Sequence, residues 1–263
     1  MNFGLRGKVA LVTAASEGLG KATAQSLARE GATLVICSRR KGAIERTAAE
    51  IAEETGADVF PVVADVSRAL SVAALMRVVK RRCGTIHVLV NNAGGPPTGG
   101  IHLLSDAAWR RAVELTLMSA VRLSRAALPM MTKQGWGRII TIASITAKQP
   151  VNDLLISSVL RPGILGLSKV LSNTCATDGI TVNTVLPGYI LTHRQEELMA
   201  SRARQGSVSR EEYMATSTAG IPAGRFGSPS EIGDVIAFLA SEQASYINGA
   251  NLLVDGGMAR GIH

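Results

Sequence analysis

The sequence has few cysteines, few aromatic residues and no long apolar segment. Its three cysteines show no CxxC spacing, which argues against a disulfide framework or a zinc site, and Cys37 and Cys175 stand in apolar runs typical of core thiols. Aromatic residues are 3% and hydrophobic residues 46% of the chain, so Ala, Val, Ile and Leu must build the core, as in buried parallel sheets. No apolar run reaches the about 18 residues of a membrane span, and no signal-peptide pattern is present. We therefore expect a cytoplasmic protein without a membrane segment.

Basic residues outnumber acidic ones, 28 against 20, which leaves a formal net charge of +8. The Lys and Arg residues are scattered, and no aromatic platforms accompany them. We therefore expect no nucleic-acid partner. Two alternatives remain for the excess charge: sites for an anionic cofactor and substrate, or a solvated basic face.

Apolar, β-branched segments alternate with Ala-rich amphipathic segments along the whole chain. This alternation predicts a single domain over residues 1–263, of the α/β class, doubly wound, with a seven-stranded parallel sheet and helices on both faces. The expected strands are 9–13, 33–38, 59–64, 88–91, 138–143, 181–185 and 251–254. The expected helices are 21–29, 43–54, 69–82, 107–131, 163–177 and 230–241.

Residues 190–226 break this alternation because they are polar, rich in Arg and contain Met. They follow the end of an expected strand, where α/β proteins place ligand-binding insertions. We interpret the segment as a small substrate lid; a surface helical excursion is the alternative.

The turn TAASEGLG, residues 13–20, lies between the first expected strand and the first expected helix. Such a turn directs backbone N–H groups and the positive end of a helix toward a pyrophosphate. Its position predicts a dinucleotide-binding fold of the Rossmann type.

The second expected strand ends in Ser38, Arg39 and Arg40. An acid about 20 residues past the glycines normally holds the ribose 2′-hydroxyl of NAD, and none is present here. A hydroxyl beside two guanidinium groups suits a 2′-phosphate, which Arg binds through paired hydrogen bonds. We predict NADP(H) as the preferred cofactor, with NAD(H) possible; solvated arginines at a strand end are the alternative.

Several motifs resemble those of the short-chain dehydrogenase/reductase family and occur in the same order along the chain. They are the turn TGxxxGxG with Ala14 in place of its first glycine, DV at 65–66, NNAG at 91–94, a serine at Ser144, PG at 187–188 and VDGG at 254–257. The resemblance covers nearly the whole chain and is strongest to 3-oxoacyl-[acyl-carrier-protein] reductases. Together with the two preceding arguments, it implies these cofactor-binding residues: Thr13, Ala15, Ser16, Gly18, Leu19, Gly20, Ser38, Arg39, Arg40, Asp65, Val66, Asn92, Ala93, Gly94, Pro187, Gly188 and Ile190.

The catalytic pattern departs from this family, whose active members carry YxxxK about thirteen residues after the serine. Counting from Ser144 places Ser157 at the Tyr position and Arg161 at the Lys position, and Thr116 stands at the position of the family's Asn. No Tyr occurs between residues 1 and 188, so no shift of register recovers one. A serine hydroxyl is a poor general acid near neutral pH, and the loss of a general acid typically costs about 10²–10⁴-fold in rate. Arg161 stays protonated and can bind ribose hydroxyls or stabilise an oxyanion.

Pro162 follows Arg161 directly, so we expect the helix either to start near Pro162 or to bend there. Three other groups are candidates for the missing acid: Tyr189, Tyr213 and His193, the last because its pKa suits proton transfer. Packing or surface roles are the alternative for each.

The resemblance implies an NADP(H)-dependent oxidoreductase acting on a carbonyl or alcohol substrate, such as a 3-oxoacyl thioester, through Ser144, Ser157, Arg161 and Thr116. A catalytically silent nucleotide-binding pseudoenzyme is the alternative. A third hypothesis is that basic lid residues dock an acidic acyl carrier protein. The resemblance also implies a homo-oligomer, a dimer or tetramer. The basic lid residues are Arg194, Arg202, Arg204 and Arg210.

Overall fold

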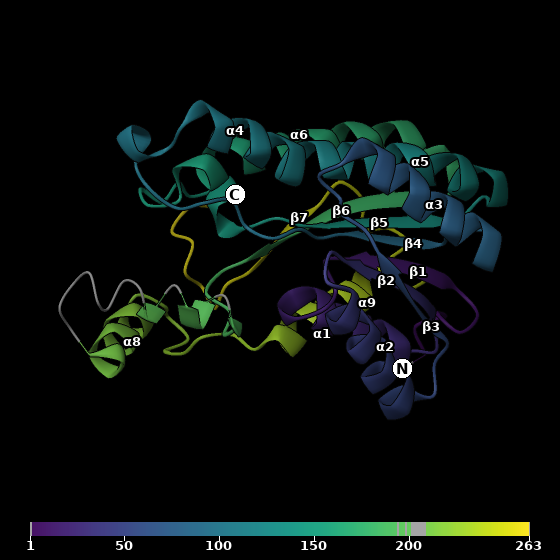
Figure 1. Cartoon of the computed structure of the whole chain (residues 1–263), viewed down its shortest axis with the longest axis horizontal. Helices are drawn as coiled ribbons and strands as arrows, with labels where there is room; N and C mark the ends of the chain where they lie inside the picture. The colour runs from purple at the N-terminus through teal and green to yellow at the C-terminus, as the bar shows by residue number, and fades with distance from the viewer. Residues whose placement is uncertain (1, 194, 198, 201–208, 263) are drawn as a thin grey trace.

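The computed structural model describes residues 2–193, 195–197, 199–200 and 209–262. Seven parallel strands form one sheet in the order β3-β2-β1-β4-β5-β6-β7 (Figure 1), which confirms the expected Rossmann-type α/β fold. Each strand begins and ends within two residues of its expected bounds. The strands are β1 Val9–Thr13, β2 Thr33–Ser38, β3 Val59–Val63, β4 Val88–Asn91, β5 Gly137–Ile142, β6 Ile180–Pro187 and β7 Asn251–Val254.

Helices cover both faces of this sheet. In Figure 1, α1, α2 and α9 lie below it, and α3, α5 and α6 lie above it. The expected helix 107–131 is in fact three consecutive segments, since a π-helical turn at Val113–Met118 separates α4 from α5. The bounds are α1 Gly18–Arg29, α2 Lys41–Thr55, α3 Ala69–Cys83, α4 Asp106–Ala112, α5 Ser119–Gln134, α6 Leu155–Cys175, α8 Arg210–Ala219 and α9 Pro229–Ala240.

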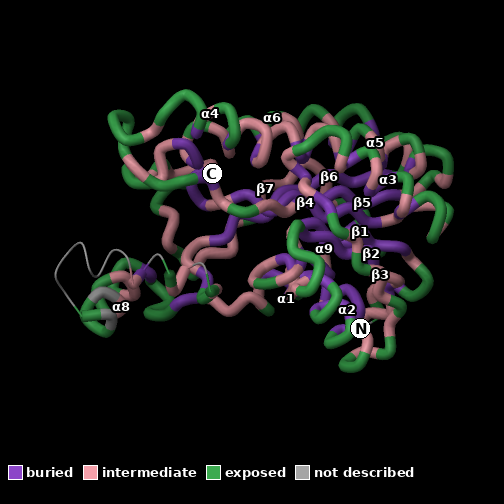
Figure 2. The backbone as a smooth tube through the Cα atoms, in the orientation of Figure 1, coloured by how far each residue is buried: buried purple, intermediate pink, exposed green. Residues whose placement is uncertain are grey.

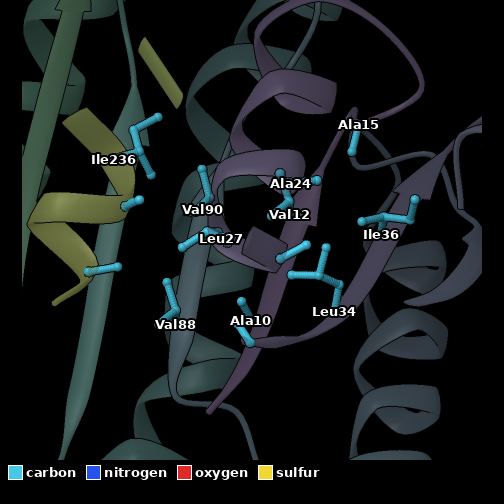
Figure 3. Packing of buried hydrophobic residues seen from close by; sticks show 14 of the residues in the cluster. Ala10, Val12, Ala15, Ala24, Leu27, Leu34, Ile36, Val88, Val90 and Ile236 are labelled. Atoms are coloured by element: carbon cyan, nitrogen blue, oxygen red, sulfur yellow. The ribbon is translucent and has the colours of Figure 1, made fainter. Parts of the chain in front are cut away.

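The central strands are buried on both faces because their residues alternate between two cores. Ala10 and Val12 of β1 pack with α1 and α9, together with Val88 and Val90 of β4 (Figure 3). Leu11, between the first two, points to the opposite core under α3 and α5. Figure 2 shows the resulting pattern, with buried strands and exposed outer helix surfaces. Aliphatic side chains that point alternately to the two faces of the sheet thus fill both cores, with few aromatic residues.

The helix α6 begins at Leu155, well before Pro162. The expectation of a helix start near Pro162 is therefore wrong, and proline lies inside the helix with its ring exposed. Proline has no N–H to donate to the carbonyl four residues earlier, which costs one hydrogen bond on the solvent side. As a result, Ser157 and Arg161 share the first two turns of one helix.

The expected lid is an excursion whose two ends are joined. Leu191 N donates to the Gly227 carbonyl at 2.8 Å, and Gly227 N donates to the Tyr189 carbonyl at 2.9 Å. Between them, α8 stands away from the sheet (Figure 1) and begins with a capping box between Ser209 and Glu212. The role of this segment as a lid stays a prediction.

Within the described ranges, one helical segment, Leu155–Asp178, is long and apolar enough to span a membrane by length and composition. It contains α6, which packs against β6 as one layer of the domain. Only 28% of its most apolar window is buried. Packing against β6 buries one apolar side of this helix, and the remaining apolar side chains lie at the surface.

Candidate active site

A cleft of about 690 Å³ opens at the carboxyl ends of the strands. It lies where β1 pairs with β2 on one side and β4 on the other, the switch point at which doubly wound sheets bind ligands. Its volume is in the usual range for a cofactor site. Three of the expected cofactor residues, Thr13, Ala15 and Gly20, do not line it. The other expected residues line it: Ser16, Gly18, Leu19, Ser38, Arg39, Arg40, Asp65, Val66, Asn92, Ala93, Gly94, Pro187, Gly188 and Ile190.

The three remaining residues belong to the turn 13–20 and are buried on its interior side. Thr13 Oγ1 donates to the Asn92 carbonyl at 2.7 Å and accepts from Asn92 N at 2.9 Å, which ties β1 to the end of β4. Ala15 is fully buried. A Cβ at Gly20 would lie 2.4 Å from the Ala14 carbonyl oxygen, so only glycine lets α1 approach the strand this closely.

Ala14 adopts a left-handed conformation with φ of 48°. This is the only non-glycine residue with positive φ among those that the structure describes. A side chain there costs about 1–2 kcal/mol relative to the right-handed region. The alanine that stands in place of the motif's first glycine therefore introduces backbone strain, and the turn forms nevertheless.

The N-termini of α1 and α2 lie at the wall of the cleft, which Gly18 and Arg40 line. Neither α1 nor α2 has an acidic residue in its first turn, so the partial positive charge at each N-terminus is free to attract anions. The residue preceding α1, Glu17, makes no capping hydrogen bond. Its carboxylate Oε2 instead accepts from Arg40 Nη2 at 3.0 Å. The glycine turn, the two helix ends and the cationic end of β2 together fit a dinucleotide.

Cys37 lies behind this region and is fully buried. Burial raises the pKa of its thiol to about 12. The thiol therefore stays protonated near neutrality and serves as a core residue, as expected. Cys175 is buried as well.

At the other end of the cleft, α6 presents Arg161 to the cavity. Its Nε donates to Ser157 Oγ at 2.9 Å, and Nη1 donates to the Ile142 carbonyl at 3.4 Å. Ser157 is 6% exposed and does not line the cleft. The expected Tyr position is thus occupied by a buried hydroxyl, and the expected Lys position supplies a cation to the cavity.

A residue that sequence reasoning missed completes this cluster. Thr146 lies in the 3₁₀ turn Ile145–Ala147 after β5, and its Oγ1 is 2.9 Å from Ser157 Oγ. Its backbone N donates to Ser144 Oγ at 3.1 Å, so Ser144 caps the turn. Ser144 does not line the cleft. Thr146 is 1% exposed and therefore connects the two expected catalytic serines from inside the wall.

Thr116 lies in the π-helical turn and borders a smaller cavity of about 20 Å³, which Arg161 also lines. Thr116 Oγ1 and Asn91 Oδ1 are buried, and neither has a hydrogen-bond partner among the described residues. The space is large enough for one water molecule. Thr116 and Arg161 thus line the same small cavity, which Ser157 does not line.

The three candidate replacement acids differ in position. The Tyr189 ring stacks on Phe226 with centroids 5.7 Å apart, and Tyr189 does not line the cleft. His193 lines the cleft, and its Nε2 is 3.2 Å from Glu197 Oε1. The side chain of Tyr213 lies outside the described residues. The same holds for the basic lid side chains Arg194, Arg202, Arg204 and Arg210.

Comparison with known proteins then identifies the family. Residues 13–259 match the family described as enoyl-(acyl carrier protein) reductase. The 3-oxoacyl-[acyl-carrier-protein] reductase FabG of Escherichia coli K12 is 35% identical over 258 residues, covering 98% of this chain and 99% of FabG.

The chain belongs to the short-chain dehydrogenase/reductase family. A putative ketoacyl reductase of Streptomyces coelicolor is 34% identical over 253 residues, covering 95% of this chain and 97% of the relative. The crystal structure of L-sorbose reductase from Gluconobacter frateurii with NADPH and L-sorbose superimposes with a TM-score of 0.96, at 35% identity over 100% of both chains. These relatives are reductases, which makes this chain an oxidoreductase of the family.

Proposed function

We propose that the protein is an NADP(H)-dependent reductase of a carbonyl compound in which Arg161, held by Ser157, takes over the electrostatic part of catalysis. The observation that carries the proposal is the placement of Arg161 in the wall of the cleft with its Nε bonded to Ser157 at 2.9 Å. The NADPH in the structures of L-sorbose reductase and of actinorhodin polyketide ketoreductase supports the choice of cofactor.

The cofactor would be held by the glycine turn, by Arg39 beside Ser38, and by the PG turn at 187–188. NADPH, when bound, supplies a hydride. Arg161 stabilises the negative charge that develops on the substrate oxygen, because a fixed cation between apolar walls acts at low dielectric. Leu115 and Ile142 line the cleft with it and provide apolar surface beside the cation.

A carbonyl reduction also needs a proton on oxygen. Ser157 is buried, and a serine hydroxyl is too weak an acid for the task near neutrality. We infer that the proton comes from water entering the open cleft or from His193 at its edge. Turnover is consequently slower than in relatives that carry a phenol.

A second reaction fits the same cation. Hydride addition to the β-carbon of an α,β-unsaturated carbonyl shifts the double-bond electrons onto oxygen, and the resulting enolate is a much weaker base than an alkoxide. Arg161 stabilises it, and water then protonates the α-carbon. The missing phenol and the match to the family described as enoyl-(acyl carrier protein) reductase favour this candidate.

Product analysis distinguishes the candidates. The protein is incubated with NADPH and matched substrates: acetoacetyl and crotonyl thioesters, and cyclohexanone and cyclohex-2-enone. Saturated alcohols from the ketones support carbonyl reduction. Saturated carbonyl products from the unsaturated compounds support conjugate reduction. Tight NADPH binding without either product supports the catalytically silent alternative.

We further propose that the protein works as a homo-oligomer in the cytoplasm on a small-molecule substrate. The apolar surface of α6 supports the oligomer, since Val159 is 55% and Val170 is 60% exposed. A second copy of the chain would cover this surface.

A further inference from the structure

Glu17 is a charged residue of the phosphate turn to which the proposed mechanism gives no role. It directly precedes α1, and its carboxylate makes no capping bond to that helix. It reaches the guanidinium of Arg40, 23 residues later, at 3.0 Å. Both side chains line the cleft, and both are largely exposed, at 59% and 66%. A nucleotide entering the cleft therefore meets this ion pair directly.

Arg39 and Arg40 follow the end of β2 and differ in their ion pairing. Ser38 Oγ donates to the Arg40 carbonyl at 3.3 Å, which holds the turn in shape. Arg40 is already engaged with Glu17. Within the described ranges no carboxylate lies within ion-pair distance of Arg39, although Arg39 lines the same cleft. Only one of the two arginines thus offers its full charge to a 2′-phosphate.

A 2′-phosphate and the Glu17 carboxylate are both anions that seek Arg40. The exposed ion pair is worth only about 0–1 kcal/mol, so a phosphate can displace it. The displaced carboxylate then lies close to the phosphate, and like charges repel. A ribose 2′-hydroxyl has the opposite relation to a carboxylate, since it donates a hydrogen bond to an acid in NAD sites.

We infer that Glu17 is a specificity-determining residue: an internal competitor for Arg40 that weakens NADPH binding and supports NADH, so that the site accepts both nucleotides. This inference rests on the proposed nucleotide site. Arg39 favours the 2′-phosphate and Glu17 opposes it, and the ratio of the two affinities reports their balance.

The test compares wild type with Glu17→Gln, which keeps the shape of the side chain and removes its charge. Dissociation constants for NADPH and NADH are measured from the fluorescence of the bound reduced nicotinamide at low ionic strength. We expect NADPH to bind roughly three- to ten-fold more tightly and NADH to bind equally or more weakly. The shift in the ratio should shrink at high salt because the charges are exposed.

The matched control is Glu45→Gln. Glu45 is exposed, pairs with Lys41 at 3.9 Å on α2 and does not line the cleft. Its removal changes the net charge equally and should leave the ratio within about two-fold. An unchanged or lower NADPH preference in Glu17→Gln, with wild-type binding intact, overturns the inference alone. Failure of wild type to bind either nucleotide overturns the proposed function and the inference with it.

Discussion

Arg161 Nε donates to the Ser157 hydroxyl at 2.9 Å from the next turn of α6, and this bond aims the guanidinium along the wall of the cleft. The spacing from Ser144 predicts that the pair stands at the positions of the family's Tyr and Lys. In the proposed function, a buried positioning hydroxyl and a permanent cation would therefore take the place of an acid and its cation.

Removing this cation should abolish most of the activity. We expect Arg161→Ala to lower kcat about 100-fold, as the loss of an oxyanion-stabilising donor does. Arg161→Lys should retain part of it, because the charge stays while the forked geometry is lost. Steady-state kinetics measure this, with Arg77→Ala as the control, since Arg77 is exposed on α3 and does not line the cleft. Equal kcat in wild type and Arg161→Ala would refute the role.

Thr146 should act as a positioning residue for Ser157. Thr146→Val preserves shape and removes the hydroxyl 2.9 Å from Ser157 Oγ, so we expect kcat to fall about five- to tenfold, the equivalent of one hydrogen bond. The NADPH dissociation constant should stay within about two-fold, since the other cofactor contacts remain. Thr146→Ser should restore kcat; a Val variant as active as wild type would contradict this.

The strain at Ala14 should be removable. With φ of 48°, Ala14→Gly relieves about 1–2 kcal/mol of left-handed strain and costs about 0.5–1 kcal/mol of chain entropy. We expect the free energy of unfolding to rise by about 0–1.5 kcal/mol, measured by urea denaturation. The control Ala73→Gly, on an exposed position of α3, should lose about 1 kcal/mol. A loss in both variants would show that Ala14 is unstrained.

Stability should depend on pH through His87. Its Nδ1 accepts a hydrogen bond from Val9 N at 3.0 Å, and burial, with the nearby charge of Lys8, lowers its pKa from 6.5. The unfolded chain therefore binds the proton more readily. The stabilising contribution is complete above about pH 6.5 and is lost as the pH falls through the lower folded pKa.

Urea denaturation at about pH 7.5 and about pH 5.5 measures this effect. Wild type should lose more stability between the two values than His87→Asn, which has no titrating group at this position. His102→Asn is the control, because His102 is exposed and its removal should leave the wild-type difference intact. Identical pH differences in wild type and His87→Asn would contradict the prediction.

We expect copies of the chain to associate through the exposed apolar side of α6. Val159→Lys combined with Val170→Lys places charges on that side and should lower the molar mass measured by light scattering after gel filtration. The single variant Leu70→Lys, at an exposed position of α3, should leave the mass unchanged. A monomeric wild type, or an unchanged mass in the double variant, would contradict the proposed interface.

The fold and most of the cleft can be predicted from the sequence because they depend on patterns of residues close together in the chain. Alternating apolar strands and a glycine turn determine β1, α1 and the switch point, and the residues at strand ends gather at one edge of any parallel sheet. The π-helical turn around Thr116 could not be predicted, because the apolar pattern of 107–131 continues through it. The start of α8 carries a local sequence signal, the capping pair Ser209 and Glu212.

Contacts between distant segments lie beyond such patterns. Nothing local indicates that the 3₁₀ turn after β5 presents Thr146 to Ser157, or that Glu17 reaches Arg40. The spacing from Ser144 did identify Ser157 and Arg161, but it could not indicate that the serine is buried and that the arginine alone reaches the cleft. Those distinctions depend on how α6 packs against β5.

The most direct test of the account follows deuterium from the nicotinamide C4 of NADPH into the product, with the ketone and unsaturated substrates named above. We expect wild type to transfer deuterium to one carbon of the substrate and Arg161→Ala to lose nearly all of this transfer while NADPH still binds. NADPH binding by wild type with no deuterium in any product would contradict the account and leave the protein as a nucleotide binder.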